Sequence, residues 1–236
     1  MALSLTPFES VWNTTTTPKT VSVTGCVTGD YLFMLAVGDM SSGNAVTACT
    51  TTTTVGSTTA WTEPVELLTQ PTTSEDWLST ATAQVTVDGS VTVSVARTKA
   101  GSQGGMWGCY VLLAKGSAGI GNVASIASPG SAQVVSLVVS QANSGVAFLM
   151  GDWDAGAVGT AWVPATAAVL VERSQQTDLT VYAAYWPSEA AGTRNYGSSG
   201  GPATAHYRSV ALEIKEAAGV AAAAYVPKRR GPQYRR

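Results

Sequence analysis

The chain has 236 residues, of which 45% are apolar and only 12% are charged. This composition excludes a disordered protein of the highly charged kind and supplies enough apolar surface for one large or two small globular domains. The net charge of −2 hides an asymmetry, because eight basic and fifteen acidic residues precede residue 217, whereas five basic residues and no acidic residue follow it.

Strand signals recur along the chain, and helix signals are nearly absent. Short alternating or apolar segments are separated by turns rich in Gly and Ser, a pattern typical of an antiparallel β-sandwich of the jelly-roll kind. The segments predicted as strands are Thr20–Thr24, Tyr31–Val37, Gln84–Val95, Gly108–Ala114, Val134–Val139, Val146–Met150, Ala168–Glu172, Leu179–Tyr185 and Val210–Ile214. Within Gln84–Val95 the dipeptide Asp88-Gly89 predicts a hairpin turn. Short helical turns are expected only near Glu63–Leu68 and Ser74–Leu78.

An internal repeat connects the two halves of the chain. Val21–Asp39 and Val135–Asp152 each contain an alternating strand, a polar turn, an apolar strand and a closing Gly-Asp. Each half also ends in an apolar strand that closes on a lysine, Lys115 or Lys215. The pattern predicts a duplicated fold.

The repeat defines the expected domain organisation. After an N-terminal segment, 1–18, a β-sandwich is predicted over 19–216, with similar halves at about 19–116 and 130–216. Each half supplies four or five predicted strands, and so few strands rarely make a stable unit alone. One joint sandwich is therefore expected, and two small sandwiches in tandem are the alternative.

Residues 217–236 are predicted to be a linker followed by an extended basic arm. An Ala-rich stretch leads into YVPKRRGPQYRR, where two prolines oppose a helix. A peptide of this kind becomes ordered by lying along a partner, with tyrosines as anchors and arginines as partners for carboxylates. The expected docking residues are Tyr225, Lys228, Arg229, Arg230, Tyr234, Arg235 and Arg236. A frayed, solubilising tail is the alternative.

The residues with chemical potential do not form a catalytic motif. His206 is the only histidine, and no nucleophile elbow, phosphate-binding loop or dinucleotide fingerprint is present. Asp152 and Asp154 alternate on one strand, and a turn-capping role is favoured over a cation site or catalysis. Three cysteines at irregular spacing indicate small buried side chains, not a disulfide framework or a zinc site. We therefore expect no enzymatic activity, no metal and no cofactor.

Aromatic residues offer a second possible contact surface. Seven Trp and eight Tyr against three Phe is an unusual balance, and several lie in or beside predicted loops. Exposed rings of this kind stack on sugars or anchor interfaces, although core packing is the more common use. The candidates for glycan or interface contacts are Trp107, Trp153, Trp186 and Tyr196.

The second half carries a family resemblance. The stretches Val146–Ala155 (VAFLMGDWDA), Thr180–Trp186 (TVYAAYW), Ala191–Gly197 (AGTRNYG) and Tyr207–Lys215 (YRSVALEIK) resemble the β-rich minor tail or accessory virion proteins of tailed bacteriophages that infect actinobacteria. The resemblance covers about residues 130–216, and the first half is a fainter copy. It implies a non-enzymatic, oligomeric component of the virion and carries over no catalytic residue.

The functional hypothesis follows from the arm and this resemblance together. We expect a structural virion protein, most simply a minor tail protein, docked onto other virion proteins through its arm. A capsid decoration or head accessory protein, and a carbohydrate-binding module that attaches the particle to a host glycan, are the alternatives. The start of the chain lacks the regions of a signal peptide, and no apolar run reaches the roughly 20 residues that span a bilayer. We therefore expect synthesis in the host cytoplasm and no membrane insertion. We also expect no nucleic-acid partner, since an acidic protein surface suits the basic arm equally well.

Overall fold

The computed structural model describes residues 2–10, 12, 15–39, 45–67, 76–100, 105–129, 134–152, 161–163, 168–175, 179–199 and 206–218. These residues form sixteen strands and no helix. The strands are β1 (Ser4–Glu9), β2 (Lys19–Cys26), β3 (Tyr31–Asp39), β4 (Ala45–Val55), β5 (Thr62–Leu67), β6 (Asp76–Gln84), β7 (Gly89–Ala100), β8 (Trp107–Lys115), β9 (Ser117–Pro129), β10 (Val134–Val139), β11 (Ser144–Asp152), β12 (Ala161–Val163), β13 (Val169–Gln175), β14 (Thr180–Glu189), β15 (Gly192–Ser199) and β16 (His206–Glu216).

The two halves of the chain have the same topology. In the first half the strands form a five-stranded sheet, β1-β8-β3-β6-β5, and a three-stranded sheet, β2-β7-β4. In the second half the corresponding sheets are β9-β16-β11-β14-β13 and β10-β15-β12, so every strand has its counterpart eight positions later. All pairs are antiparallel, and the order in each half is that of an eight-stranded jelly roll whose fifth strand has joined the larger sheet. The prediction of an all-β, antiparallel, jelly-roll-like fold with similar halves is confirmed.

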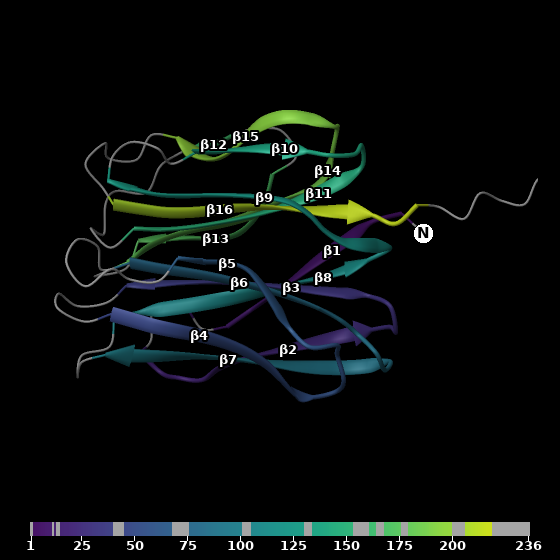
Figure 1. Ribbon diagram of the computed structural model, residues 1–236, viewed down its shortest axis with the longest axis horizontal. Helices are drawn as coiled ribbons and strands as arrows, with labels where there is room; N and C mark the ends of the chain where they lie inside the picture. Colours follow the sequence, from purple (N-terminus) through teal and green to yellow (C-terminus); the bar gives the residue numbers. More distant parts are fainter. Residues whose placement is uncertain are drawn as a thin grey trace, which may run out of the picture.

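The two sandwiches are stacked through their five-stranded sheets, which gives four layers (Figure 1). Across the stack β3 lies against β11, β6 against β16 and β5 against β9. At the centre β3 faces its own counterpart, β11. Elsewhere a strand faces the counterpart of another strand: β6 faces the counterpart of β8, and β5 faces the counterpart of β1. The two sandwiches are therefore related by an approximate twofold axis that runs parallel to the strands. Because a rotation about such an axis keeps the strand direction, corresponding corners of both sandwiches lie at the same end of the molecule.

Three apolar cores fill the spaces between the four layers. The first core lies inside the first sandwich and includes Leu32, Met34, Val93 and Trp107. The interface core lies between the five-stranded sheets and includes Phe33, Leu35, Tyr110, Leu149, Val181 and Leu212. The second core lies inside the second sandwich and includes Leu137, Phe148, Tyr182, Trp186 and Tyr196.

The position of each strand in the stack follows from its apolar pattern. Strands of the central sheets are covered on both faces, so neighbouring residues such as Leu32 and Phe33 enter different cores. Strands of the outer sheets have one face in a core and one in water, and β2 accordingly alternates, with Val21 and Val23 buried and Thr20 and Ser22 exposed.

The expected joint sandwich is replaced by two complete sandwiches. Each half has eight described strands, more than the four or five predicted, because β1, β4, β5 and most of β6 in the first half and β9, β12 and β15 in the second were missed in the sequence. β1 lies within the segment 1–18 that was set apart as an N-terminal segment, and β9 lies in the stretch left out before residue 130. β1 pairs with β8, and β9 pairs with β16, so both strands are integral to the five-stranded sheets.

Three local predictions were wrong. Asp88-Gly89 does not close a hairpin, because β6 and β7 belong to different sheets and the chain crosses the sandwich between them. The segments expected as helical turns contribute to strands β5 and β6. The two Gly-Asp pairs are also out of phase: a Cβ on Gly38 would meet Trp107 in the first core, whereas one on Gly151 would meet Val37 in the interface core.

Candidate functional site

The root of the predicted docking arm is firmly held. The backbone N–H of Ala217 donates to the carbonyl of Gly116 at 2.8 Å, which continues the β16 edge past Glu216. The carbonyl of Glu216 accepts from the side-chain amide of Gln141 at 2.8 Å, and its carboxylate accepts from the Leu3 N–H at 3.3 Å. The arm therefore starts beside the N-terminus at one end of the stack (Figure 1). Its seven predicted docking residues lie outside the described residues, which end at 218.

Three of the four candidate contact aromatics are core residues. Trp107, Trp186 and Tyr196 are 0% exposed, and a ring without exposed surface cannot stack on a sugar or anchor a partner. Trp107 packs against Trp77 at 5.4 Å, and Trp186 packs edge-on against Tyr196 at 5.0 Å. The glycan or interface interpretation is therefore wrong for these three. Trp153 lies outside the described residues.

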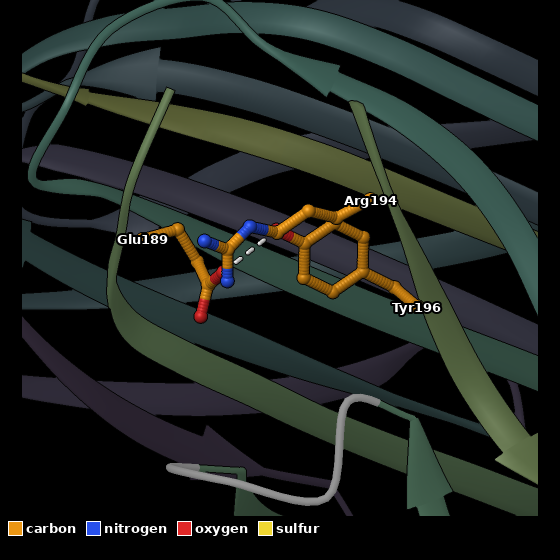
Figure 2. Close-up of polar contacts among 3 residues, drawn as sticks. All are labelled: Glu189, Arg194 and Tyr196. Atoms are coloured by element: carbon orange, nitrogen blue, oxygen red, sulfur yellow. Dashed lines mark hydrogen bonds and ion pairs between the residues drawn. The ribbon is translucent and has the colours of Figure 1, made fainter. Parts of the chain in front are cut away.

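Tyr196 belongs to a polar cluster that ties β14 to β15 (Figure 2). Its hydroxyl donates to the carboxylate of Glu189 at 3.1 Å, and the guanidinium of Arg194 donates to the same carboxylate oxygen at 3.0 Å. Burial and the neighbouring carboxylate of Glu189 raise the pKa of the Tyr196 hydroxyl, so it stays protonated and acts as a donor. The Glu189 side chain is 5% exposed and the Arg194 side chain is 43% exposed. The cluster fastens the crossing between two sheets from its surface side.

Glu213 is a heavily hydrogen-bonded side chain of the second sandwich. Its side chain is 0% exposed. One carboxylate oxygen accepts from the N–H and the hydroxyl of Ser140 at 2.7 and 2.9 Å and from the Ser144 hydroxyl at 2.9 Å, and the other accepts from the Asn122 N–H at 2.9 Å. Burial raises the pKa of Glu213, but these hydrogen bonds together outweigh burial and hold the pKa below its ordinary value. The ionised carboxylate therefore joins β9, the β10–β11 corner and β16.

Two buried cations, Arg97 and Lys19, lie beside Trp107 in the first sandwich. The Arg97 guanidinium lies 5.3 Å from the Trp107 ring and donates to the carbonyl of Gly105 at 2.6 Å, while the ammonium of Lys19 lies 5.0 Å from the same ring. Burial lowers the pKa of Arg97 to about 10. For Lys19, burial is the main cause of a pKa lowered to about 8, and Arg97 adds to it against the opposing effect of Cys109. Both cations are held over tryptophan faces inside the fold.

The three cysteines are free and buried, as the sequence predicted for Cys26 and Cys109. Burial raises the pKa of Cys49 to about 12 and of Cys109 to about 11. These thiols stay protonated at neutral pH and behave as small apolar side chains.

A groove of about 340 Å³ opens at one seam between the two sandwiches, where the edge strands β5 and β9 meet. We call it the seam groove. Its described walls combine apolar groups, threonine hydroxyls and one tyrosine, and none of the described lining residues is charged. The lining residues are Tyr31, Thr59, Ala60, Thr62, Thr82, Ala83, Gln84, Ala118, Gly119 and Ile120.

Within the described residues, no group of three or more His, Cys, Asp or Glu side chains could hold a metal ion. The same part of the chain contains no helix long and apolar enough to cross a membrane. Comparisons with protein-family models, with curated proteins and with solved structures gave no match.

Proposed function

We propose that this chain is a non-enzymatic structural component of a tailed-phage virion, a minor tail protein that docks onto the particle through its basic C-terminal arm. The observation that carries the proposal is the contrast at Glu216. A body of two stacked sandwiches ends there in a root fixed by three hydrogen bonds, and all the positive charge that follows lies on one short peptide.

The use of the buried charged groups supports a structural role. Glu213 and Glu189 hold strand corners, and Arg97 binds backbone carbonyls beside two tryptophans. The jelly-roll fold is shared by capsid, lectin and enzyme domains, so the fold alone does not select among these functions. The resemblance of the second half to minor tail and accessory virion proteins adds support, and it favours several copies in one assembly.

Ending the chain after Ala218 tests the docking role. This truncation keeps the Ala217–Gly116 hydrogen bond, so the midpoint of thermal unfolding should stay the same. Incorporation into particles should be lost, because the arm supplies the docking contacts. A full-length variant with Ser at all five basic positions of the arm is the matched control for charge, and its incorporation should be equally weak. Normal incorporation of the truncated chain would contradict the proposal.

The place on the particle separates a minor tail protein from a capsid decoration or head accessory protein. An antibody or gold label against the folded body should mark the tail in electron micrographs of intact particles. Labelling distributed over the head would favour the decoration alternative and leave docking through the arm intact.

A carbohydrate-binding adhesion module is the second candidate, because lectin domains share the jelly-roll architecture. With Trp107, Trp186 and Tyr196 in the cores, Trp153 is the candidate aromatic to test. The Trp153→Ala variant should lose binding on a glycan array while the body stays folded. An array that is silent for the unmodified chain would remove this candidate.

A further inference from the structure

The two seams of the stack are related by the approximate twofold axis but are filled differently. The strand pairing identifies corresponding residues in the two halves. Leu5 on β1 pairs with Ala114 on β8, and Ile120 on β9 pairs with Ile214 on β16. On the other side of β8 and β16, Tyr31 pairs with Ala114 and Gly145 pairs with Ile214. The strand β1 at one seam thus corresponds to β9 at the other. Likewise, Gly145 at the first seam corresponds to Tyr31 at the second.

At the β1 seam two leucines cover Gly145. Leu5 and Leu3 pack over Gly145 so tightly that a Cβ there would lie 2.7 Å from one Leu5 methyl group and 3.3 Å from one of Leu3. At the β9 seam the residues in those places are Ala118 and Ile120, with Gly119 between them. Ile120 is as large as Leu5, but Ala118 is smaller than Leu3, and the seam groove opens there beside Tyr31.

The groove lies next to the root of the arm. Lys215, two residues before Ala217, pairs with Gly119, which lines the groove. The Ala-rich linker 217–224 spans up to roughly 25 Å when extended, which suffices to turn back and bring Tyr225 to the groove. A segment tethered so close has an effective concentration in the millimolar range, so even weak contacts hold it.

The chemistry of the groove suits the first part of the arm. An uncharged wall with an aromatic ring and hydroxyl groups takes a tyrosine and a proline without leaving a buried charge. Glu63 and Glu66 follow Thr62 on β5, and their mutual repulsion adds to burial in raising the pKa of Glu63. Both carboxylates face β4 and not the groove, because Glu66 accepts from the Cys49 N–H at 3.0 Å and Glu63 interacts with the backbone of Thr51. The groove therefore suits Tyr225 and Pro227, and the arginines that follow them stay available to a partner.

We propose that the seam groove is the resting site of the chain's own C-terminal arm, with Tyr225–Pro227 in the hollow. This inference rests on the proposed function of the arm as a docking peptide. The groove stores the arm on the isolated chain, and docking onto the particle releases it.

Disulfide trapping tests the location. The native thiols are buried, so two introduced cysteines report on the arm alone. In the full chain, Ala60→Cys with Val226→Cys should form an intrachain disulfide under mild oxidation at low protein concentration. In the matched pair, Ser22→Cys with Val226→Cys, the first cysteine lies on the exposed face of the outer sheet. Because the arm is not held beside this position, this pair should form its disulfide at least about tenfold more slowly. Equal rates for both pairs, or interchain dimers from the Ala60 pair, would overturn the proposal.

Trypsin cleavage after Arg229 and Arg230 provides a second measurement. The cleavage rate follows the population of the undocked arm when docking is fast. Ala118→Trp fills the groove and should speed cleavage by about fivefold or more, whereas Val87→Trp, at an exposed corner of the first sandwich, should leave the rate unchanged. Thermal unfolding of both variants establishes that each is folded. The same rate in Ala118→Trp as in the unmodified chain would refute the resting site.

The two failures can be told apart. If groove variants behave like the unmodified chain but the chain ended after Ala218 still fails to join particles, the resting site is wrong and the docking role stands. If that truncated chain joins particles normally, the docking role itself is lost, whatever the groove holds.

Discussion

The two sandwiches share strand order and direction but secure the same corner with different chemistry. Between β2 and β3 the turn is held by two aspartates. The buried Asp30 accepts from the Val27 N–H at 2.8 Å, and the exposed Asp88 accepts from both the N–H and the hydroxyl of Thr28 at 2.7 Å. Between β10 and β11 the corresponding turn is held from inside by the buried carboxylate of Glu213.

This difference separates what determines the fold from what stabilises it. A common topology arises in both halves from the order of apolar strands, while the corner residues have neither position nor type in common. An exposed carboxylate adds little to stability because water competes for its hydrogen bonds. Removal of a buried carboxylate is costly, because its buried donors are left without an acceptor. The two halves should therefore respond very differently to removal of the corner residue.

Glu213→Ala should have the largest effect. It leaves the backbone N–H groups of Asn122 and Ser140, the Ser140 hydroxyl and the buried Ser144 hydroxyl without their acceptor, so we expect a loss of about 3–5 kcal/mol in the free energy of unfolding. Urea unfolding at pH 7 measures this loss.

Asp88→Ala is the control at the corresponding corner, and it should change stability little because Asp88 is exposed. Similar losses in both variants would contradict the contrast between the corners.

The lowered pKa of Glu213 also predicts an acid response of stability. Because this pKa is lower in the folded chain, the stabilisation by Glu213 is present above the unfolded pKa near 4.3 and disappears as the pH falls through the folded pKa. The Glu213→Gln variant should lack this part of the acid response.

Gly151→Ala tests the interface core that joins the two sandwiches. A Cβ at this position would clash with a methyl group of Val37, so the alanine side chain should overpack the interface and cost about 1–3 kcal/mol. Val37→Ala removes the opposing methyl groups. The double variant should therefore lose less stability than the sum of the two single variants, which a double-mutant cycle measures. Strict additivity would mean that Gly151 and Val37 do not meet.

Tyr110→Phe tests a single hydrogen bond across the same interface. The buried hydroxyl of Tyr110 on β8 donates to the carbonyl of Phe148 on β11 at 2.9 Å, so its loss should cost about 1 kcal/mol. Tyr31→Phe, at the partly exposed seam, is the control and should cost less. A negligible effect at Tyr110 would show that this bond contributes nothing to joining the halves.

The class of fold could be predicted from the sequence because strand patterns are local. The alternating Thr20–Thr24 and Val135–Val139 became outer strands, and the continuous apolar runs Tyr31–Val37 and Gly108–Ala114 became central strands. That difference was the signal for four layers, since only a strand covered on both faces is apolar throughout. Among the strands that were not predicted, β1 and β9 have strand patterns diluted by proline, glycine or serine. The edge strands β4, β5 and β12 and the polar strand β15 lacked a continuous apolar signal.

The candidate site was harder to predict, because its contacts join segments from different sheets. Glu213 sits in phase with Ala211 on the inward face of an otherwise apolar strand, and this phase was a usable signal of a buried carboxylate. The same argument applied to Trp186, in phase with Tyr182 and Ala184, would have assigned it to a core. The contact of Glu189 with Tyr196 had no such signal, since the crossing between their sheets brings them together.

Lys19 should give the smallest effect, with stability rising with pH as it does for Glu213, but in the alkaline range. Its pKa is about 8 in the folded chain and about 10.5 when unfolded, so the unfolded chain binds more protons between these values. Stability should therefore rise with pH in this window by about 1 kcal/mol, after allowance for screening by water at the end of the sandwich. Raised thiol pKa values at Cys49 and Cys109 act in the opposite direction there, so the measurement is the difference between the unmodified chain and Lys19→Met. Lys115→Met, at the other end of the same sandwich, should show no such difference, and a response shared by both variants would trace the alkaline behaviour to net charge and not to the cation held over Trp107.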